Sequence, residues 1–166
     1  MANWEDFKMG VQDSLSIRHR VCIQIAHDFI AGHALWHIVY WNLPGRGAGS
    51  EETKLRAKKT IGGVTDYCLA RSGTDAFEKI GITDRQWGVA LKKLAKLKLI
   101  KTKVMNFDAH GTTHIWLNRD LFASEYIKAK EALARLKAVR KEKQAQEKSK
   151  RAENLSKRNN WRVINA

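Results

Sequence analysis

Apolar residues in the first part of the chain recur at every fourth position and then merge into a nearly continuous run. The spaced residues are Ile17, Val21, Ile25 and Phe29. This spacing predicts a helix over about Ser16–His33 with one side packed inward. Residues 34–43 are rich in aromatic and β-branched side chains, which favours either a buried strand or a last core-bound stretch of helix. We assign residues 1–43 to an N-terminal helical and aromatic core segment.

The clearest break in the pattern lies in residues 44–50, where the only proline stands among three glycines. Such a segment predicts a surface loop that ends the first unit. A second helix is expected from Glu51, interrupted at the glycine pair of residues 62–63. Residues 64–71 are then expected to form a separate helix. The side chains expected to face inward there are Val64, Tyr67 and Cys68.

Residues 74–87 have the pattern of a short helix, a tight turn at Gly81 and the start of a second helix. Thr83 suits the N-cap of the second helix and Gln86 its third position, which together form the pattern of a capping box. The two positions of a hydrophobic staple at the same boundary are Ile82 and Trp87. These agreeing local signals predict a helix-turn-helix.

Helical geometry divides the second helix, about residues 84–98, into two faces. The inward face consists of Trp87, Ala90, Leu91, Leu94 and Leu97. The outward stripe consists of Arg85, Val89, Lys92 and Lys96, with Gln86 and Lys93 beside it. A helix that buries one side and exposes a basic, hydrogen-bonding side fits the major groove of DNA. Arg85 and Gln86 lie in the first turn, from which recognition helices contact base edges.

Two β-type runs around a polar, glycine-containing tip follow this helix, within about residues 99–117. They predict a β-hairpin. Lys101 and Lys103 share one face of its first strand, and His110 lies at the tip. We expect this hairpin to be a wing that touches the DNA backbone or the minor groove beside the helix.

The run ALKKLAKLKLIKTKV followed by GTTHIWL resembles the recognition helix and wing of winged helix-turn-helix proteins, especially phage and plasmid replication initiators and bacterial repressors. The resemblance covers residues 73–118. It implies that residues 51–118 form a winged helix-turn-helix, and that the protein binds duplex DNA to regulate transcription or initiate replication. Relatives often have glycine before the Leu-Ile pair, where this chain has Lys98, and a left-handed conformation there costs about 1 kcal/mol.

From residue 119 the sequence predicts a helix that is amphipathic over 119–140 and continues as a basic tail over 141–166. Its apolar seam consists of Phe122, Tyr126, Ala129, Leu133 and Leu136. The 4-3-4-3 spacing suits the domain's own core or a partner helix, so a homodimer through 120–139 is one expectation. Residues 141–160 are polar and basic with no apolar face to bury, so we expect this stretch to be frayed or disordered when the protein is free. This part is either a solubilising tail or a phosphate-binding arm. An apolar patch resumes at residues 161–164, where it could dock on a partner or on the body of the protein.

The net charge of +14 is concentrated in two segments. Residues 84–103 hold seven Lys or Arg and one acid, and residues 128–162 hold thirteen against four. The rest of the chain is close to neutral, with eleven bases and twelve acids. This distribution indicates a polyanionic partner that meets these two segments.

Several classes of protein are disfavoured by the sequence. Two cysteines without CxxC spacing fit a reduced, cytoplasmic protein. No leader pattern opens the chain and no long uncharged apolar run occurs, so secretion and membrane spanning are not expected. The glycine-rich segment 44–50 lacks the Gly-Lys-Ser/Thr ending of a phosphate-binding P-loop. We expect no enzyme activity and no cofactor.

The N-terminal histidines leave one enzymatic alternative open. Their pattern at residues 33–37 is His-Ala-Leu-Trp-His, without the glutamate of an HExxH metal site. We expect packing roles for these histidines and no metal. The alternatives kept beside DNA binding are a small metal-dependent nuclease and an oligomeric phage assembly or packaging subunit.

The expected fold is therefore mostly α with a small β-hairpin wing: a winged helix-turn-helix with an N-terminal helical unit and a long basic C-terminal helix. The residues expected to read bases are Arg85, Gln86, Val89, Lys92 and Lys96. The residues expected to hold the backbone are Lys93, Lys101, Lys103 and His110.

Overall fold

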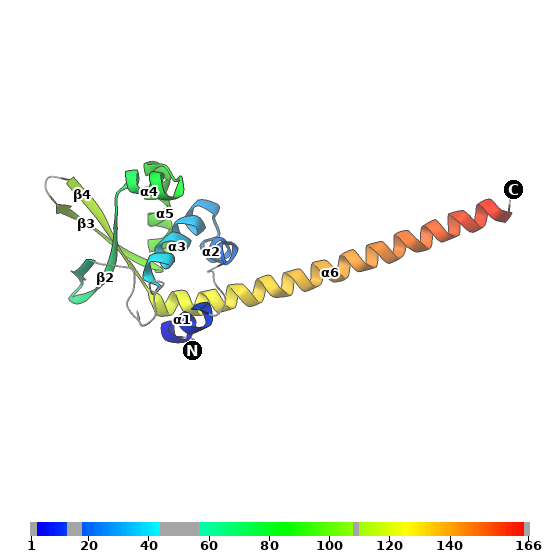
Figure 1. The fold of residues 1–166 in the computed structure, drawn as a ribbon, viewed down its shortest axis with the longest axis horizontal. Coiled ribbons are helices and arrows are strands. Elements are labelled where there is room, and N and C mark those ends of the chain that lie inside the picture. The colour runs from blue at the N-terminus through cyan, green and yellow to red at the C-terminus, as the bar shows by residue number, and fades with distance from the viewer. Residues whose placement is uncertain (1–2, 13–17, 44–56, 108–109, 165–166) are drawn as a thin grey trace. The chain divides into compact units, whose positions relative to one another are not determined.

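A computed structural model of the protein describes residues 3–12, 18–43, 57–107 and 110–164. The chain divides into two compact units, residues 1–129 and 130–166. The protein is mostly helical, with one small antiparallel sheet and a long C-terminal helix, α6 (Figure 1). The coarse fold expected from the sequence is thus confirmed. The predicted loop at 44–50 lies outside the described residues.

The N-terminal part consists of three helices, α1 (Trp4–Gln12), α2 (His19–Ala26) and α3 (Phe29–Asn42). One continuous helix through residue 33 was expected, and this prediction is wrong. His27 adopts a left-handed conformation with φ 50°, and the Asp28 side chain caps α3 by accepting a hydrogen bond from the backbone N–H of Ala31 at 2.7 Å. The break leaves Phe29 65% exposed.

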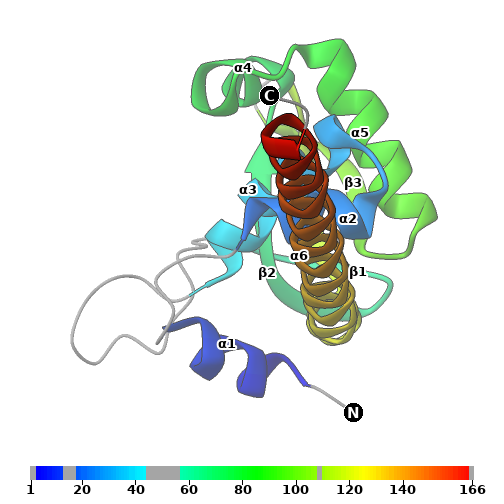
Figure 2. The same ribbon diagram turned by 90° about the vertical axis from the view of Figure 1, so that its right-hand side faces the viewer.

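Helix α3 packs against both α2 and α5 (Asp84–Lys96) and forms the middle of the first unit (Figure 2). Of the two structures considered for residues 34–43, the core-bound helix is the correct one. A Cβ atom at Gly32 would overlap the backbone of Ile23, so α2 and α3 meet where glycine permits close approach.

Strands β1 (Ala57–Ile61) and β2 (Val64–Arg71) form a hairpin where helices were predicted. Gly62 and Gly63 take φ values of 56° and 79°, as a two-residue hairpin turn requires. Thr60 and Thr65 flank the turn and join their hydroxyls at 2.8 Å. The helical prediction for residues 64–71 is therefore wrong. Cys68 is buried as expected, but Val64 is 63% exposed.

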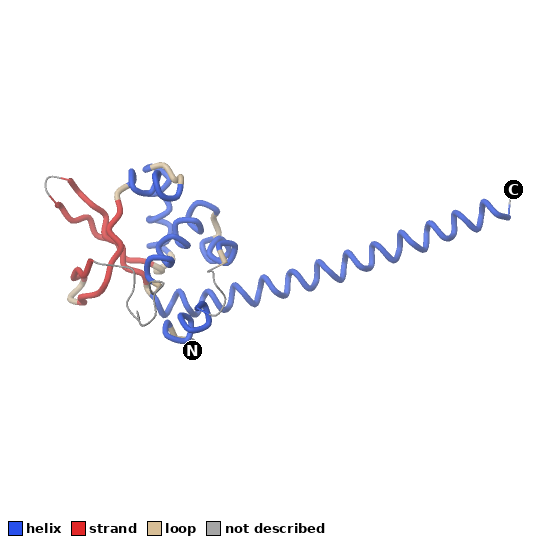
Figure 3. Tube along the Cα trace, viewed as in Figure 1, coloured by secondary structure: helices blue, strands red, loops and turns tan. Residues whose placement is uncertain are grey.

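Helices α4 (Gly73–Ile80) and α5 follow β2, and strands β3 (Ile100–Phe107) and β4 (His110–Leu117) complete the sheet. The strand order is β1-β2-β4-β3, and every pairing is antiparallel. The strands are the red segments in Figure 3. Strand β2 pairs with β1 over its first part and with β4 through residues 69–71. The predicted hairpin at 99–117 is thus one edge of a larger sheet.

The core of the first unit joins α3, α5, β4 and the first turns of α6 (Arg119–Ile164). Its fully buried side chains include Leu35, Ile38, Leu94, Ile115 and Phe122. The rings of Trp4 and Phe7 from α1 lie 6.3 and 5.3 Å from the ring of Phe122. Tyr126 and Ala129 are buried as well. The first half of the apolar seam therefore belongs to the protein's own core.

Helix α6 continues through the second unit to Ile164, beyond residue 140, where helical order was expected to end. Residues 130–155 of this helix are exposed except for the half-buried Leu133. The extension has a local cause, because the chain contains no glycine after Gly111 and no proline after Pro44, and Lys, Arg, Glu, Gln and Ala favour helix. None of the described helices is long and apolar enough to cross a membrane.

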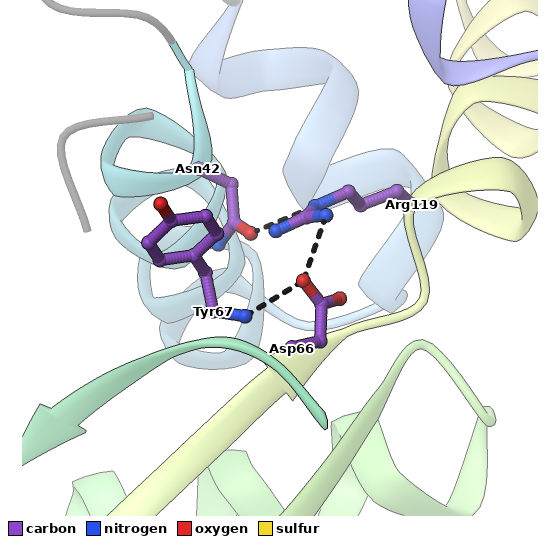
Figure 4. Close-up of polar contacts among 4 residues, drawn as sticks. All are labelled: Asn42, Asp66, Tyr67 and Arg119. Atoms are coloured by element: carbon purple, nitrogen blue, oxygen red, sulfur yellow. Dashed lines mark hydrogen bonds and ion pairs between the residues drawn. The ribbon is translucent and has the colours of Figure 1, made fainter. Parts of the chain in front are cut away.

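A polar cluster fixes the start of α6 to two other elements (Figure 4). The Arg119 guanidinium donates Nε–H to Oδ1 of Asn42 and Nη1–H to Oδ1 of Asp66, each at 3.3 Å. Asp66 also accepts from the backbone N–H of Tyr67 at 2.6 Å, and buried Asn42 donates to the carbonyl of Ile38. The end of α3, strand β2 and the first turn of α6 are thereby held together.

Candidate nucleic-acid interface

Both helices of the α4–α5 pair begin with a capping box. For α5, Gln86 N–H donates to Oγ1 of Thr83 at 3.3 Å, and Thr83 N–H donates to Oε1 of Gln86 at 3.0 Å, so this prediction is confirmed. For α4, Ser72 and Asp75 exchange the corresponding bonds, and the backbone bond from Ser72 is the main reason that the pKa of Asp75 is lowered. The Ser-x-x-Asp pattern encodes this second box locally, although it was not among the predicted caps.

The turn between the helices is set by Gly81 at φ 69°, a left-handed value that favours glycine. Ile82 and Trp87, the two predicted staple residues, are 2% and 3% exposed. This buried pair stands on both sides of the N-cap and sets the direction in which α5 leaves the turn. The first turn of α5 is therefore ordered by both polar and apolar contacts.

The faces of α5 divide as predicted, with one exception. Trp87, Ala90, Leu91 and Leu94 are buried. The outward residues Arg85, Gln86, Val89, Lys92, Lys93 and Lys96 are all exposed. Leu97, assigned to the inward face, is 39% exposed because it is the C-cap residue and the chain leaves the helix there. The exposed stripe thus combines one apolar residue with cations and an amide.

Gln86 is exposed, but its amide oxygen has an internal role. Oε1 accepts hydrogen bonds from both the backbone N–H and the hydroxyl of Thr83, each at 3.0 Å. Reading adenine by a paired contact requires the oxygen and the nitrogen of the amide together. Gln86 therefore has to leave the capping box before it can read adenine in this way, whereas Arg85 makes no such internal bond among the described contacts.

The outward residue Lys93 forms an ion pair with a residue outside α5. Its ammonium donates to Oδ2 of Asp28, the N-cap residue of α3, at 2.8 Å. The pKa of Asp28 is lowered, first by the bond from Ala31 N–H and next by the bond from Lys93. The pair is partly exposed, so its stabilisation is small, but it ties α5 to the junction of α2 and α3.

The end of α5 contains the strained residue that the sequence indicated. Lys98 has φ 60°, its N–H donates to the carbonyl of Ala95 at 2.9 Å, and Leu99 N–H donates to the carbonyl of Leu94 at 3.1 Å. This is a Schellman ending with lysine in place of glycine, at a cost of about 1 kcal/mol. The Lys98 side chain is exposed. It adds a cation between α5 and β3 that was not among the predicted contacts.

Strand β3 carries the two predicted wing lysines on one face. Lys101 pairs with Trp116 and Lys103 with His114, and both lysines are exposed whereas both partners on β4 are buried. Val104 is 64% exposed on the same strand. His110 begins β4 opposite Phe107, but residues 108–109 and the side chain of His110 lie outside the described residues.

The N-terminal histidines form a pair rather than a metal cluster. Nδ1 of His33 and Nε2 of His19 lie 2.7 Å apart, and Nε2 of His33 lies 3.1 Å from the carbonyl oxygen of Ile80. In the described ranges, no group of three or more His, Cys, Asp or Glu residues is placed to hold a metal ion. Both cysteines are buried thiols, and burial raises the pKa of Cys22 to about 12.

A comparison with protein-family models finds no match, and searches of curated proteins and of solved structures find no significant match.

Proposed function

We propose that this protein binds double-stranded DNA in a sequence-specific manner, as a regulator of transcription or an initiator of replication. Helix α5 would enter the major groove, and the β3–β4 hairpin would lie on the backbone as the wing of a winged helix-turn-helix. The observation that carries the proposal is the outward face of α5, a capped helix that exposes Arg85, Val89, Lys92 and Lys96 directly before a hairpin exposing Lys101 and Lys103.

The order of the elements supports this proposal. A short helix, a glycine turn and a capped basic helix lead directly into an antiparallel hairpin, which is the order on which the winged-helix resemblance rests. The pairing of β2 with residues 113–115 in the middle of β4 adds a third strand to the hairpin. A hairpin paired in this way can hold its lysines at a defined place beside α5.

The contacts divide into base readers and backbone contacts. Arg85 in the first turn is the strongest base-reading candidate, because arginine donates two parallel bonds to guanine. Val89, Lys92 and Lys96 follow on the same stripe, and Gln86 contributes after release of its oxygen from Thr83. The backbone residues are Lys101, Lys103, His110 and Lys93, the last in exchange for its bond to Asp28.

The basic second unit would add phosphate contacts without reading sequence. Residues 128–162 hold thirteen Lys or Arg against four acids, and the residues of this stretch from 130 to 155 are exposed apart from Leu133. Each neutralised phosphate releases counterions, so such a helix strengthens binding to any duplex and makes binding depend on salt.

The test is selection of binding sites from random duplexes by the full chain, by Arg85→Ala and by Lys8→Ala. Lys8 lies on α1 and is paired with Glu5, so its substitution removes the same charge away from α5. The proposal predicts a defined selected site for the wild type and for Lys8→Ala, and a relaxed preference for Arg85→Ala by about 1–3 kcal/mol at one base pair. No enrichment from the wild type, or an unchanged site with Arg85→Ala, contradicts it.

A further inference from the structure

A stripe of aromatic rings lies along one side of α3. Its members are Phe29, His33, Trp36 and Tyr40, at positions i, i+4, i+7 and i+11. Phe29 is 65% exposed and Tyr40 is 43% exposed, and the two residues between them are half-buried. We call these four residues the α3 stripe. Large aromatic groups exposed together on one helix face mark a surface that contacts another molecule.

The rings of the α3 stripe are held in place by one another. Trp36 stacks on His33 with ring centroids 5.8 Å apart and on Tyr40 with centroids 6.1 Å apart. His19 of α2 adds edge contacts to Phe29 and Trp36 at 6.0 and 5.8 Å. The short contact between His19 and His33 fixes the centre of the stripe. Rings ordered in advance lose little conformational entropy when a partner arrives.

The stripe is also free of net charge. Helix α3 contains no Asp, Glu, Lys or Arg. At its first turn Asp28 and Lys93 form a 2.8 Å ion pair, which cancels both charges. In a chain of net charge +14, this helix therefore has the aromatic, charge-poor surface that is typical of the centre of protein–protein interfaces.

We propose that two copies of this chain pair through their α3 stripes around a two-fold axis. Self-pairing fits because an uncharged stripe can face its own copy without opposing like charges, whereas the basic faces of α5 and α6 repel a second copy. A two-fold contact brings the same patch from both chains together, which suits rings that stack and pack edge to face. The dimer does not depend on DNA.

The rival surface on α6 fits a second copy less well. Phe122, Tyr126 and Ala129 of the expected dimer seam are buried in the core of the first unit. The part left for a partner consists of the half-buried Leu133 and of Leu136 and Val139, each of which is 61% exposed. Exposed cations flank it at Lys130, Lys137, Arg140 and Lys141. Two such helices would bring lysines and arginines against one another.

The exposed area of the α3 stripe comes from four side chains, which is small beside the roughly 800 Å² per partner of a stable interface. We therefore expect a weak dimer, with a dissociation constant in the micromolar range. Sedimentation velocity of the full chain without DNA, over a wide concentration series, measures it. The mass should rise from one chain of 19.0 kDa towards two as concentration increases.

Substitutions on three elements locate the interface. Phe29→Glu places a carboxylate in the first turn of α3, where the helix dipole favours it, and should raise the dimer dissociation constant by about tenfold or more. Phe29→Ser should also raise the dimer dissociation constant, without adding a charge. Leu136→Glu on α6 and Val104→Glu on β3 change residues of similar exposure and should leave dimerisation unchanged.

Several outcomes overturn the inference. The inference is wrong if the wild-type chain stays monomeric at every concentration. It is also wrong if Phe29→Glu and Phe29→Ser both dimerise as the wild type does. A dimer that is absent in Leu136→Glu and kept in Phe29→Glu assigns the contact to α6 instead. Because the experiment contains no DNA, none of these results bears on the proposed DNA binding, which site selection tests separately.

Discussion

Helices α3 and α5 pack against each other in one core, yet their exposed faces differ in chemistry. The outward face of α5 carries Arg85 and three lysines, whereas that of α3 carries aromatic rings and no formal charge. Leu35 and Ile38 of α3 and Leu94 of α5 are fully buried, so the inward faces are of the same kind. Burial alone therefore does not separate the two helices; their exposed residues do, and these are the residues from which we propose DNA binding for α5 and self-association for α3.

A substitution in the core that α3 and α5 share should weaken both exposed surfaces at once. Leu94→Ala truncates a fully buried side chain of α5, the helix that packs against α3, and should lower the free energy of unfolding by about 3 kcal/mol. Denaturant unfolding measures the decrease. DNA binding and self-association should both weaken in this variant at elevated temperature. A change below about 1 kcal/mol would mean that α3 and α5 do not share a tightly packed core.

Acid should destabilise the protein through His37, a buried residue of α3. Burial, followed by the positive charge of Arg71 and the effect of His33, lowers the pKa of His37 from 6.5 to about 4. The unfolded chain takes up this proton first, so the stability that neutral His37 contributes is complete above pH 6.5 and is lost as the pH falls towards 4. The loss is about 3 kcal/mol by the end of that range.

Thermal unfolding of the wild type and of His37→Gln from about pH 7 to pH 5 tests this prediction, because most carboxylates are still ionised there. The midpoint should fall with pH in the wild type and change much less in the variant. Parallel curves for the two proteins would show that His37 does not titrate in this range.

Removal of residues 141–166 sharpens the charge side of the comparison. Eight cations leave with this segment: Lys141, Lys143, Lys148, Lys150, Arg151, Lys157, Arg158 and Arg162. Affinity for any duplex and the salt dependence of binding should both fall, by about 0.9 in slope for each phosphate that is no longer neutralised, while the preferred site stays the same. Titrations at several salt concentrations measure the slope. An unchanged slope would show that this segment only solubilises the protein.

The smallest expected effect is that of Lys101→Ala on β3. A backbone contact carries no sequence information, so affinity for specific and random duplexes should fall by the same modest factor. Competition between the two duplexes measures the ratio. A changed base preference would place Lys101 among the base readers.

The two helices α4 and α5 and the turn between them could be predicted from the sequence because their signals are local. Thr83 and Gln86 are three residues apart, and Gly81 stands at the turn itself. The first hairpin was also locally encoded, by Gly62 and Gly63 between β-branched residues, but a glycine pair can equally interrupt a helix, as was predicted here. The propensity of the flanking residues for strands is the signal that separates the two possibilities.

Other features depend on residues far apart in the chain and could not be predicted in this way. The Asp28 cap of α3 is local, but the ion pair that ties this cap to α5 joins Asp28 and Lys93, which are 65 positions apart. The first half of the α6 seam is buried because the rings of Trp4 and Phe7 cover Phe122. The α3 stripe could not be distinguished from core residues because a helix without charged residues offers no contrast between a polar and an apolar face.

The most direct test of the proposed DNA binding is a pair of titrations of the full chain, followed by fluorescence anisotropy, with a selected duplex and with a scrambled duplex of the same composition. At physiological salt we expect binding to the selected site that is tighter by about a thousandfold or more. Raising the salt should weaken both complexes and keep this preference. Equal affinities for the two duplexes at every salt concentration would contradict sequence-specific binding.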